Sequence, residues 1–187
     1  MNTFIYVGIL GALGYSEDFK MMIQNGFTRK YIFAATLSMF AFIGGIMSFV
    51  DTVMGNLLHY FVPNYNSLFG VIYGYGDILP NWIWLFLLYM LISSLSYLAV
   101  LAIHKLEKTL SLCLVAILAG IILLAVALFR YVLPQNLVDS IRKLASRAMG
   151  FMNGGTVNYL LPLLTLLLLA AVFYLGAYAI IRRTEVK

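Results

Sequence analysis

The sequence has little of the chemistry on which catalytic and metal-binding proteins depend. Its 187 residues include one cysteine, Cys113, and two histidines, His59 and His104. One cysteine excludes a disulfide within the chain, and neither histidine has a Cys, Asp or Glu at the spacing of a metal site. No G-x-x-x-x-G-K-[ST] stretch is present, so the chain lacks that phosphate-binding loop for ATP. We therefore expect no catalytic site, no metal and no cofactor held by this chain.

Charge is also scarce, and most of it is positive. Charged residues make up 10% of the sequence, with 12 Lys and Arg against 7 Asp and Glu, whereas 63% of the residues are hydrophobic. A net charge of +5 could suit a nucleic-acid partner, but the basic residues are scattered at the ends of apolar stretches and form no dense patch. This distribution is typical of a membrane protein and argues against nucleic-acid binding.

Four long apolar stretches without any Asp, Glu, Lys or Arg dominate the sequence. They are residues 31–50, 82–103, 110–129 and 156–181. A helix needs about 20 apolar residues to cross a hydrocarbon core that is roughly 30 Å thick. A fifth stretch, residues 4–15, would span only about 18 Å. The sequence therefore predicts an all-α polytopic membrane bundle with four clear spans and one short N-terminal membrane segment, in a single domain over residues 1–187.

The basic residues predict the orientation of these spans. Lys and Arg close to helix ends are retained on the cytoplasmic side of a membrane. Four basic residues fall in the segment between the third and fourth clear spans, and the other eight fall on the opposite side. The eight are Lys20, Arg29, Lys30, Lys105, Lys108, Arg182, Arg183 and Lys187. We therefore expect a multi-pass protein of the cell membrane whose C-terminus is cytoplasmic.

A short amphipathic segment precedes the first clear span. Ser16 can cap a helix over residues 17–25, and Gly26 stands where a helix C-cap is expected. The apolar residues on one face of this helix, or just after it, are Phe19, Met22, Ile23 and Phe27. That face can rest on lipid as an interfacial helix or dock on a cytoplasmic partner, and both interpretations fit the periodicity. Arg29 and Lys30 follow and would fix the segment at the inner headgroups.

A second amphipathic segment covers residues 135–152. Its apolar residues form one stripe, and its polar face carries Arg142 and Arg147. Such a helix can lie in the outer headgroups or fold over the mouth of a pathway, where a basic face also suits an anionic substrate. Gly154 and Gly155 are predicted to end it.

Two further features inside the spans have alternative interpretations. Asp51 is the one acid close to the hydrophobic body of a span and falls near the predicted outer end of its helix. It is either solvated at the interface or part of a substrate or proton path, which makes Asp51, Arg142 and Arg147 our candidates for the pathway or its outer gate. Ser93 and Ser94 lack a G-x-S-x-G elbow and are predicted to pack helices together.

Residues 25–33, Asn-Gly-Phe-Thr-Arg-Lys-Tyr-Ile-Phe, place a glycine, a small hydroxyl residue and two bases before a helix with an early aromatic residue. This stretch resembles the cytoplasmic segment of type 2 ATP-binding-cassette exporter permeases. In that family the segment joins the second and third spans, and the short helix before it is the coupling helix that seats on the ATPase subunit. The later order is similar too: a small basic loop at 104–108, two spans separated by an outer amphipathic stretch, and a final Arg182-Arg183.

The resemblance implies a membrane-spanning subunit that forms a substrate pathway with a second permease chain, as a homodimer or a heterodimer. Separate ATPase subunits would bind ATP, and their movement would reach the spans through residues 17–30. The residues that it assigns to ATPase coupling are Phe19, Met22, Ile23, Phe27, Arg29 and Lys30. Such permeases commonly have six spans, so this chain matches the family as though the first span and part of the second were absent.

Two other classes of function are compatible with the sequence. One is a small membrane carrier or binding subunit that works without an ATPase, and the other is a structural or signalling membrane protein. A carrier predicts a pair of interrupted, polar-lined spans, and the sequence shows little of that pattern.

Overall fold

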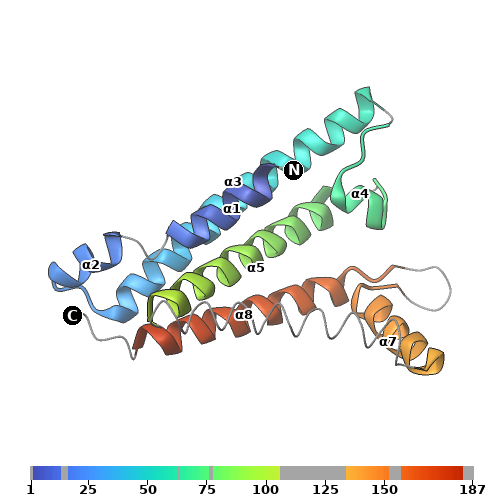
Figure 1. Ribbon diagram of the computed structural model, residues 1–187. Coiled ribbons are helices and arrows are strands. Elements are labelled where there is room, and N and C mark those ends of the chain that lie inside the picture. The colour runs from blue at the N-terminus through green and yellow to red at the C-terminus, as the bar shows by residue number, and fades with distance from the viewer. Residues whose placement is uncertain are drawn as a thin grey trace. The chain divides into compact units, whose positions relative to one another are not determined.

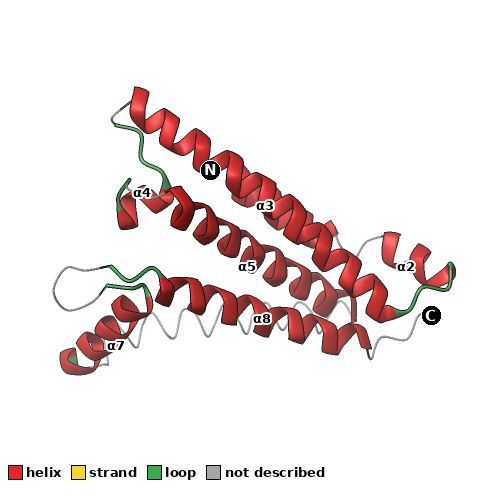
Figure 2. Ribbon diagram, turned by 180° about the vertical axis from the view of Figure 1, so that it is seen from behind, coloured by secondary structure: helices red, strands yellow, loops and turns green. Residues whose placement is uncertain are grey.

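The computed structural model describes residues 2–13, 17–62, 64–75, 78–105, 134–151 and 157–182, and most of these are helical (Figures 1 and 2). The helices are α1 (Asn2–Leu13), α2 (Glu17–Gln24), α3 (Arg29–Phe61), α4 (Leu68–Tyr73), α5 (Ile78–Lys105), α7 (Gln135–Ala148) and α8 (Leu160–Arg182). Within these ranges there is no β-strand, only an isolated antiparallel bridge between Phe151 and Val157. The predicted all-α fold is thus confirmed for the described part of the chain.

Three helices, α3, α5 and α8, are long and apolar enough to cross a membrane. They contain most of the predicted stretches 31–50, 82–103 and 156–181. Helix α1 is apolar but only 12 residues long, in agreement with the short N-terminal segment that the sequence predicts. The remaining predicted span, residues 110–129, lies outside the described residues.

The chain divides into two compact units, Met1–Leu101 with Leu163–Lys187, and Ala102–Pro162. The first unit contains α1 to α4 and most of α5 and α8, and the second contains α7. The expectation of one domain over residues 1–187 stays a prediction.

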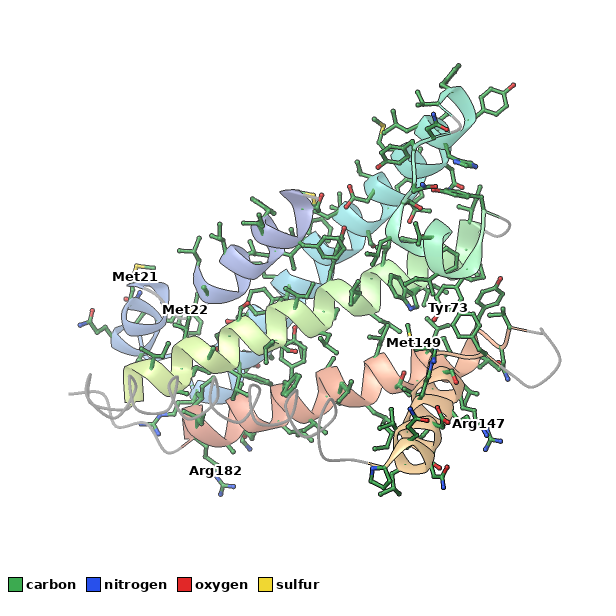
Figure 3. The ribbon with its side chains drawn as sticks, turned by 45° about the vertical axis from the view of Figure 1, so that its right-hand side comes forward. Met21, Met22, Tyr73, Arg147, Met149 and Arg182 are labelled. Atoms are coloured by element: carbon green, nitrogen blue, oxygen red, sulfur yellow. The ribbon has the colours of Figure 1, made fainter. Side chains whose placement is uncertain are left out.

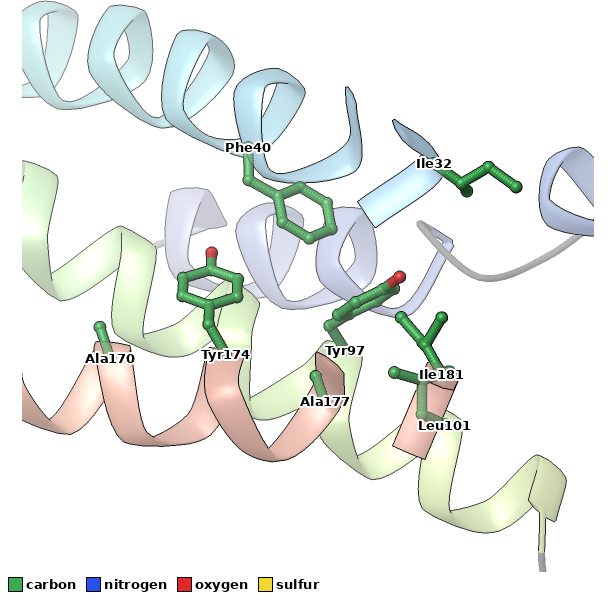
Figure 4. Close-up of a cluster of buried hydrophobic side chains, with 8 residues drawn as sticks. All are labelled: Ile32, Phe40, Tyr97, Leu101, Ala170, Tyr174, Ala177 and Ile181. Atoms are coloured by element: carbon green, nitrogen blue, oxygen red, sulfur yellow. The ribbon is translucent and has the colours of Figure 1, made fainter. Parts of the chain in front are cut away.

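In the first unit α3 runs antiparallel to α5 and α8 (Figure 1). One buried cluster joins the three helices (Figure 4) and consists of Ile32, Phe40, Tyr97, Leu101, Ala170, Tyr174, Ala177 and Ile181. Ile32 lies at the start of α3, whereas Leu101 and Ile181 lie towards the ends of α5 and α8. The start of α3 therefore meets the ends of the other two helices. This is the arrangement that the predicted alternation of spans requires.

Helix α3 packs through small and hydroxyl residues. Its buried positions recur at every fourth residue from Thr36 through Phe40, Gly44 and Ser48 to Thr52. Each of the three hydroxyls donates a hydrogen bond to a carbonyl of α3 itself, as when Thr52 Oγ1 donates to the Ser48 carbonyl at 2.8 Å. Small side chains with satisfied hydroxyls let neighbouring helices approach closely without a hydrophobic driving force.

Ser93 and Ser94 are buried in α5, and Ser93 joins two helices as predicted. Its Oγ lies 3.0 Å from the hydroxyl of Tyr174 on α8 and also donates to the Met90 carbonyl at 3.0 Å. The serine therefore serves helix packing, with its hydrogen-bonding capacity used inside the bundle.

Helix α1 crosses α5 at a glycine. A Cβ placed on Gly11 would lie 2.6 Å from the carbonyl oxygen of Ser93 and 2.9 Å from its Cα, whereas at Gly8 the nearest atom would be Ser96 Oγ at 3.6 Å. Only the first of these positions leaves no room for a methyl group, because the opposing atoms belong to backbone.

Gly11→Ala is therefore expected to lower the free energy of unfolding by about 1–3 kcal/mol through overpacking. Gly8→Ala, one helical turn away, is the matched control. It should leave stability unchanged or raise it by up to about 1 kcal/mol, since alanine favours helix over glycine. Thermal unfolding of both variants in detergent micelles checks the difference. Equal melting temperatures for the two would contradict the packing described here.

Two helix ends differ from the prediction. Helix α3 does not stop near Val50 but continues to Phe61, because a polar residue does not end a helix. The chain leaves it at Val62, which precedes a proline and therefore disfavours the α conformation. Helix α7 ends before Gly150, with φ of +87°, and not at Gly154 and Gly155.

Candidate functional site

The segment between α2 and α3 is a tight helix-to-helix turn. Gly26 has φ of +81°, and the amides of Gly26 and Phe27 donate to the carbonyls of Ile23 and Met22 at 3.0 and 3.1 Å. This pair of bonds is a Schellman motif, in which glycine adopts the left-handed conformation without steric penalty. The predicted role of Gly26 as the C-cap is confirmed. The motif directs the chain straight into α3, which begins at Arg29.

The apolar residues of this segment separate into two groups. Met22 and Ile23 pack against the buried cluster, because α2 contacts α3. Met21 and Phe27 remain 53% and 57% exposed; Figure 3 shows Met21 and Met22 on α2. The predicted docking face of Phe19, Met22, Ile23 and Phe27 is therefore not a single free surface. Phe27 with Met21 forms the exposed part, which we call the exposed pair, and Phe19 lies in the first turn of α2.

Basic residues gather at the same end of the first unit. The Arg29 guanidinium donates to the carbonyl oxygen of Arg182 at 2.8 Å, so the start of α3 closes the C-terminal end of α8. A cation there is favourable, since the last carbonyls of a helix lack intrahelical partners and carry partial negative charge. Lys30 follows on α3 and is exposed. We call this the basic end.

The opposite half of the first unit contains a polar site around Asp51. The Tyr89 hydroxyl, from α5, donates to Asp51 Oδ2, and the Thr3 hydroxyl, from α1, donates to Oδ1 at 3.3 Å. Phe4 packs edge-on against the Tyr89 ring, with ring centroids 5.4 Å apart. Asp51 is half-buried and has ten further residues of α3 after it. The prediction that it lies near the end of its helix is therefore wrong, and three helices hold its carboxylate.

The segment after α3 folds back towards this site. The Tyr75 ring stacks on His59, with centroids 3.6 Å apart and planes 3° from parallel. The Tyr75 hydroxyl accepts from the Ser67 amide at 2.5 Å and donates to the Tyr65 carbonyl at 3.1 Å. His59 Nδ1 lies 2.9 Å from the same carbonyl, to which its N–H can donate. These contacts tie the loop before α4 to the last turn of α3.

A cavity of about 320 Å³ lies between these elements, and we call it the Asp51 pocket. Its lining residues are Thr3, Phe4, Asp51, Met54, Gly55, Tyr65, Asn66, Ser67, Leu68, Val71, Ile72, Leu85 and Tyr89. Polar groups from Asp51 and the loop 65–67 thus face apolar walls from α1, α4 and α5. Among these lining residues there is no Lys, Arg or His.

A second, larger cavity of about 680 Å³ lies along α3, α5 and α8. Its walls are mostly aromatic and aliphatic, among them Phe33, Met90, Leu167 and Tyr178, and Lys30 is also part of the lining. The Phe33 ring packs on that of Tyr178 with centroids 5.2 Å apart. Walls of this kind favour an acyl or aromatic group over a hydrophilic solute.

The other two gate candidates, Arg142 and Arg147, are exposed on α7. They belong to the second unit, whereas Asp51 belongs to the first, so no shared site is described for the three residues. The apolar side chains Leu137, Ile141 and Leu144 of α7 are exposed as well. Helix α7 begins at Gln135, as the sequence predicts, but ends at Ala148 and not at residue 152. Its place in the headgroups stays a prediction.

Thr3 and Tyr89 are not among the site residues that the sequence predicts. They lie 48 and 38 positions from Asp51 in the sequence, on helices whose apolar residues point in all directions.

In the part of the chain that the structure describes, no group of three or more His, Cys, Asp or Glu residues could hold a metal ion. Comparisons with protein-family models, curated proteins and solved structures found no match to this chain.

Proposed function

We propose that this chain is a membrane-spanning subunit of an ATP-binding-cassette exporter, working with separate ATPase subunits and a second permease chain. In this proposal α3, α5 and α8 cross the cell membrane, and the basic end faces the cytoplasm. The exposed pair on the α2 turn would receive the movement of the ATPase, and Arg29 and Lys30 would hold the turn at the inner headgroups.

The observation that carries the proposal is the construction of the turn between α2 and α3. A rigid Schellman cap joins a short helix directly to a long apolar helix, and two large apolar side chains remain exposed beside the joint. A force applied to α2 would pass into α3 without an intervening flexible linker. Met22 and Ile23 strengthen the connection between α2 and the long helices, because they pack against the cluster that joins α3, α5 and α8.

The length of α3 agrees with a span that begins at the basic end. Asp51 follows Arg29 by 22 positions, which corresponds to about 33 Å of helix, close to the roughly 30 Å thickness of a hydrocarbon core. With Arg29 at the inner boundary, the Asp51 pocket lies at the outer boundary, and the last turns of α3 extend beyond it. The apolar cavity along α3, α5 and α8 would then lie at the depth of the lipid tails.

Purification of the tagged chain from its native membrane tests the proposal. We expect a copurifying subunit that contains a G-x-x-x-x-G-K-[ST] loop and hydrolyses ATP. Phe27→Asp should reduce the recovered ATPase at least about tenfold, since loss of an aromatic anchor at an interface costs roughly 2 kcal/mol or more.

The matched control is Phe61→Asp, which changes the same residue type at the other end of α3, where the side chain is 73% exposed. It should leave ATPase recovery unchanged. The proposal fails if no subunit with this loop copurifies, or if the two variants lose it equally.

A further inference from the structure

We propose that the Asp51 pocket binds the ammonium group of a small amphiphilic cation, with the carboxylate of Asp51 as its counter-ion and the apolar walls as the seat of its hydrocarbon part. The proposal rests on the proposed function only where it treats this cation as a transported substrate. Binding itself needs no ATPase.

The first argument is charge. Asp51 accepts hydrogen bonds from two neutral hydroxyls, those of Thr3 and Tyr89, whereas a carboxylate offers about four lone-pair sites. The lining of the pocket, as far as the structure describes it, contains no basic side chain. Asp51 is half-buried, and a carboxylate that has lost part of its hydration is stabilised by a positive charge nearby. A ligand cation completes the site.

The second argument is how the donors are arranged. Thr3 and Tyr89 come from α1 and α5, on two different helices, and each donates to a different oxygen of Asp51. The carboxylate is therefore fixed in orientation before any ligand arrives, and a preorganised charge loses less free energy on binding.

The third argument is the division of the pocket into polar and apolar parts. Tyr65, Asn66 and Ser67 form a polar stretch of the lining, whereas Phe4, Leu68, Val71, Ile72 and Leu85 are apolar. A volume of about 320 Å³ accommodates a short alkyl chain. An ammonium at Asp51 with an alkyl chain against the apolar residues satisfies both parts of the lining. An anion would meet Asp51 unfavourably, and a fully apolar ligand would leave the carboxylate without a counter-ion.

The experiment compares three probes of equal chain length on the purified natural chain in nonionic detergent, by isothermal titration calorimetry. The probes are hexylammonium, hexanol and hexanoate. Hexylammonium should bind at least about tenfold more tightly than hexanol, and hexanoate should not bind, because the charge of the head group decides affinity at a half-buried counter-ion. Equal affinity for hexylammonium and hexanol, or measurable binding of hexanoate, would overturn the proposal. This comparison needs no variant and so does not depend on how any variant folds.

Asp51→Asn then localises the effect, since it keeps the shape and an acceptor oxygen for Tyr89 but removes the charge. It should weaken the binding of hexylammonium at least about tenfold and change the affinity for hexanol by less than about twofold. Asp139→Asn changes an exposed acid on α7 and should change neither affinity. Undiminished hexylammonium binding to a folded Asp51→Asn variant would overturn the proposal.

One further probe distinguishes the source of the ammonium. Dihexanoyl-phosphatidylethanolamine that displaces hexylammonium would identify a lipid headgroup as an occupant, whereas failure to displace it would assign the pocket to free amines. Either result leaves ammonium recognition in place. If the chain does not prefer hexylammonium but an ATPase copurifies with it, the cation site is wrong and the exporter proposal stands. If the chain prefers hexylammonium but no ATPase copurifies, the exporter proposal is wrong and the cation site stands.

Discussion

Phe40→Ala is expected to lower the free energy of unfolding by about 3–5 kcal/mol. Phe40 is 1% exposed and packs edge-on against the Tyr97 ring, with centroids 5.6 Å apart. It lies in the cluster that joins α3, α5 and α8, so truncation opens a cavity at the contact of all three helices. Association of helices in a membrane depends on such packing, because lipid tails are as apolar as the side chains that they replace.

Phe42→Ala is the matched control, two positions along the same helix. Phe42 is 70% exposed, and in a membrane its neighbours would be lipid tails, which fill the space that alanine leaves. Its change in stability should stay below about 1 kcal/mol. Reversible unfolding of each purified variant with increasing mole fraction of dodecyl sulfate, followed by helical circular dichroism, measures the two values. Similar losses for Phe40→Ala and Phe42→Ala would mean that the buried cluster does not hold the bundle together.

The helices themselves could be predicted from the sequence because their cause is local. A stretch of about 20 residues without charge favours a membrane helix wherever it occurs, and α3, α5 and α8 follow from that rule. The turn after α2 was also local, since Gly26 is the residue best able to adopt positive φ after a short helix. The loss of apolar character after Val50 does not mark the end of α3, because the proline after Val62 determines it.

The site could be predicted only in part, because it depends on contacts between helices. A helix that is apolar on all sides has no sequence signal for its rotation about its own axis, and α5 is of this kind. Nothing in the sequence therefore indicates that Tyr89 faces Asp51.

The orientation of α2 could not be predicted from the sequence either. Periodicity places Met22 and Ile23 on an apolar face, but whether that face meets the bundle or a partner depends on how α2 lies against α3. In the structure these two residues pack inward, and Met21 and Phe27 remain exposed.

The second prediction with a large expected effect concerns the side of the membrane on which each end of α3 lies. The exporter proposal requires Phe27 to lie in the cytoplasm, because ATPase subunits act there. It requires Phe61, at the far end of the 33-residue helix, to lie outside. Both side chains are more than half exposed, so cysteines at these positions are suited to labelling. The single native cysteine, Cys113, allows a cysteine-free background to be made with one change, Cys113→Ser.

A membrane-impermeant maleimide measures this directly on Phe27→Cys and Phe61→Cys. It is applied to intact cells and, separately, to inside-out vesicles stripped of peripheral subunits, so that the proposed ATPase does not cover position 27. Phe42→Cys serves as the control that should react from neither side, because lipid would cover it. We predict that Phe61→Cys reacts in intact cells and that Phe27→Cys reacts only in inside-out vesicles. Reaction of Phe27→Cys in intact cells, or reaction of both ends from the same side, would contradict the proposal that an ATPase drives this chain through α2.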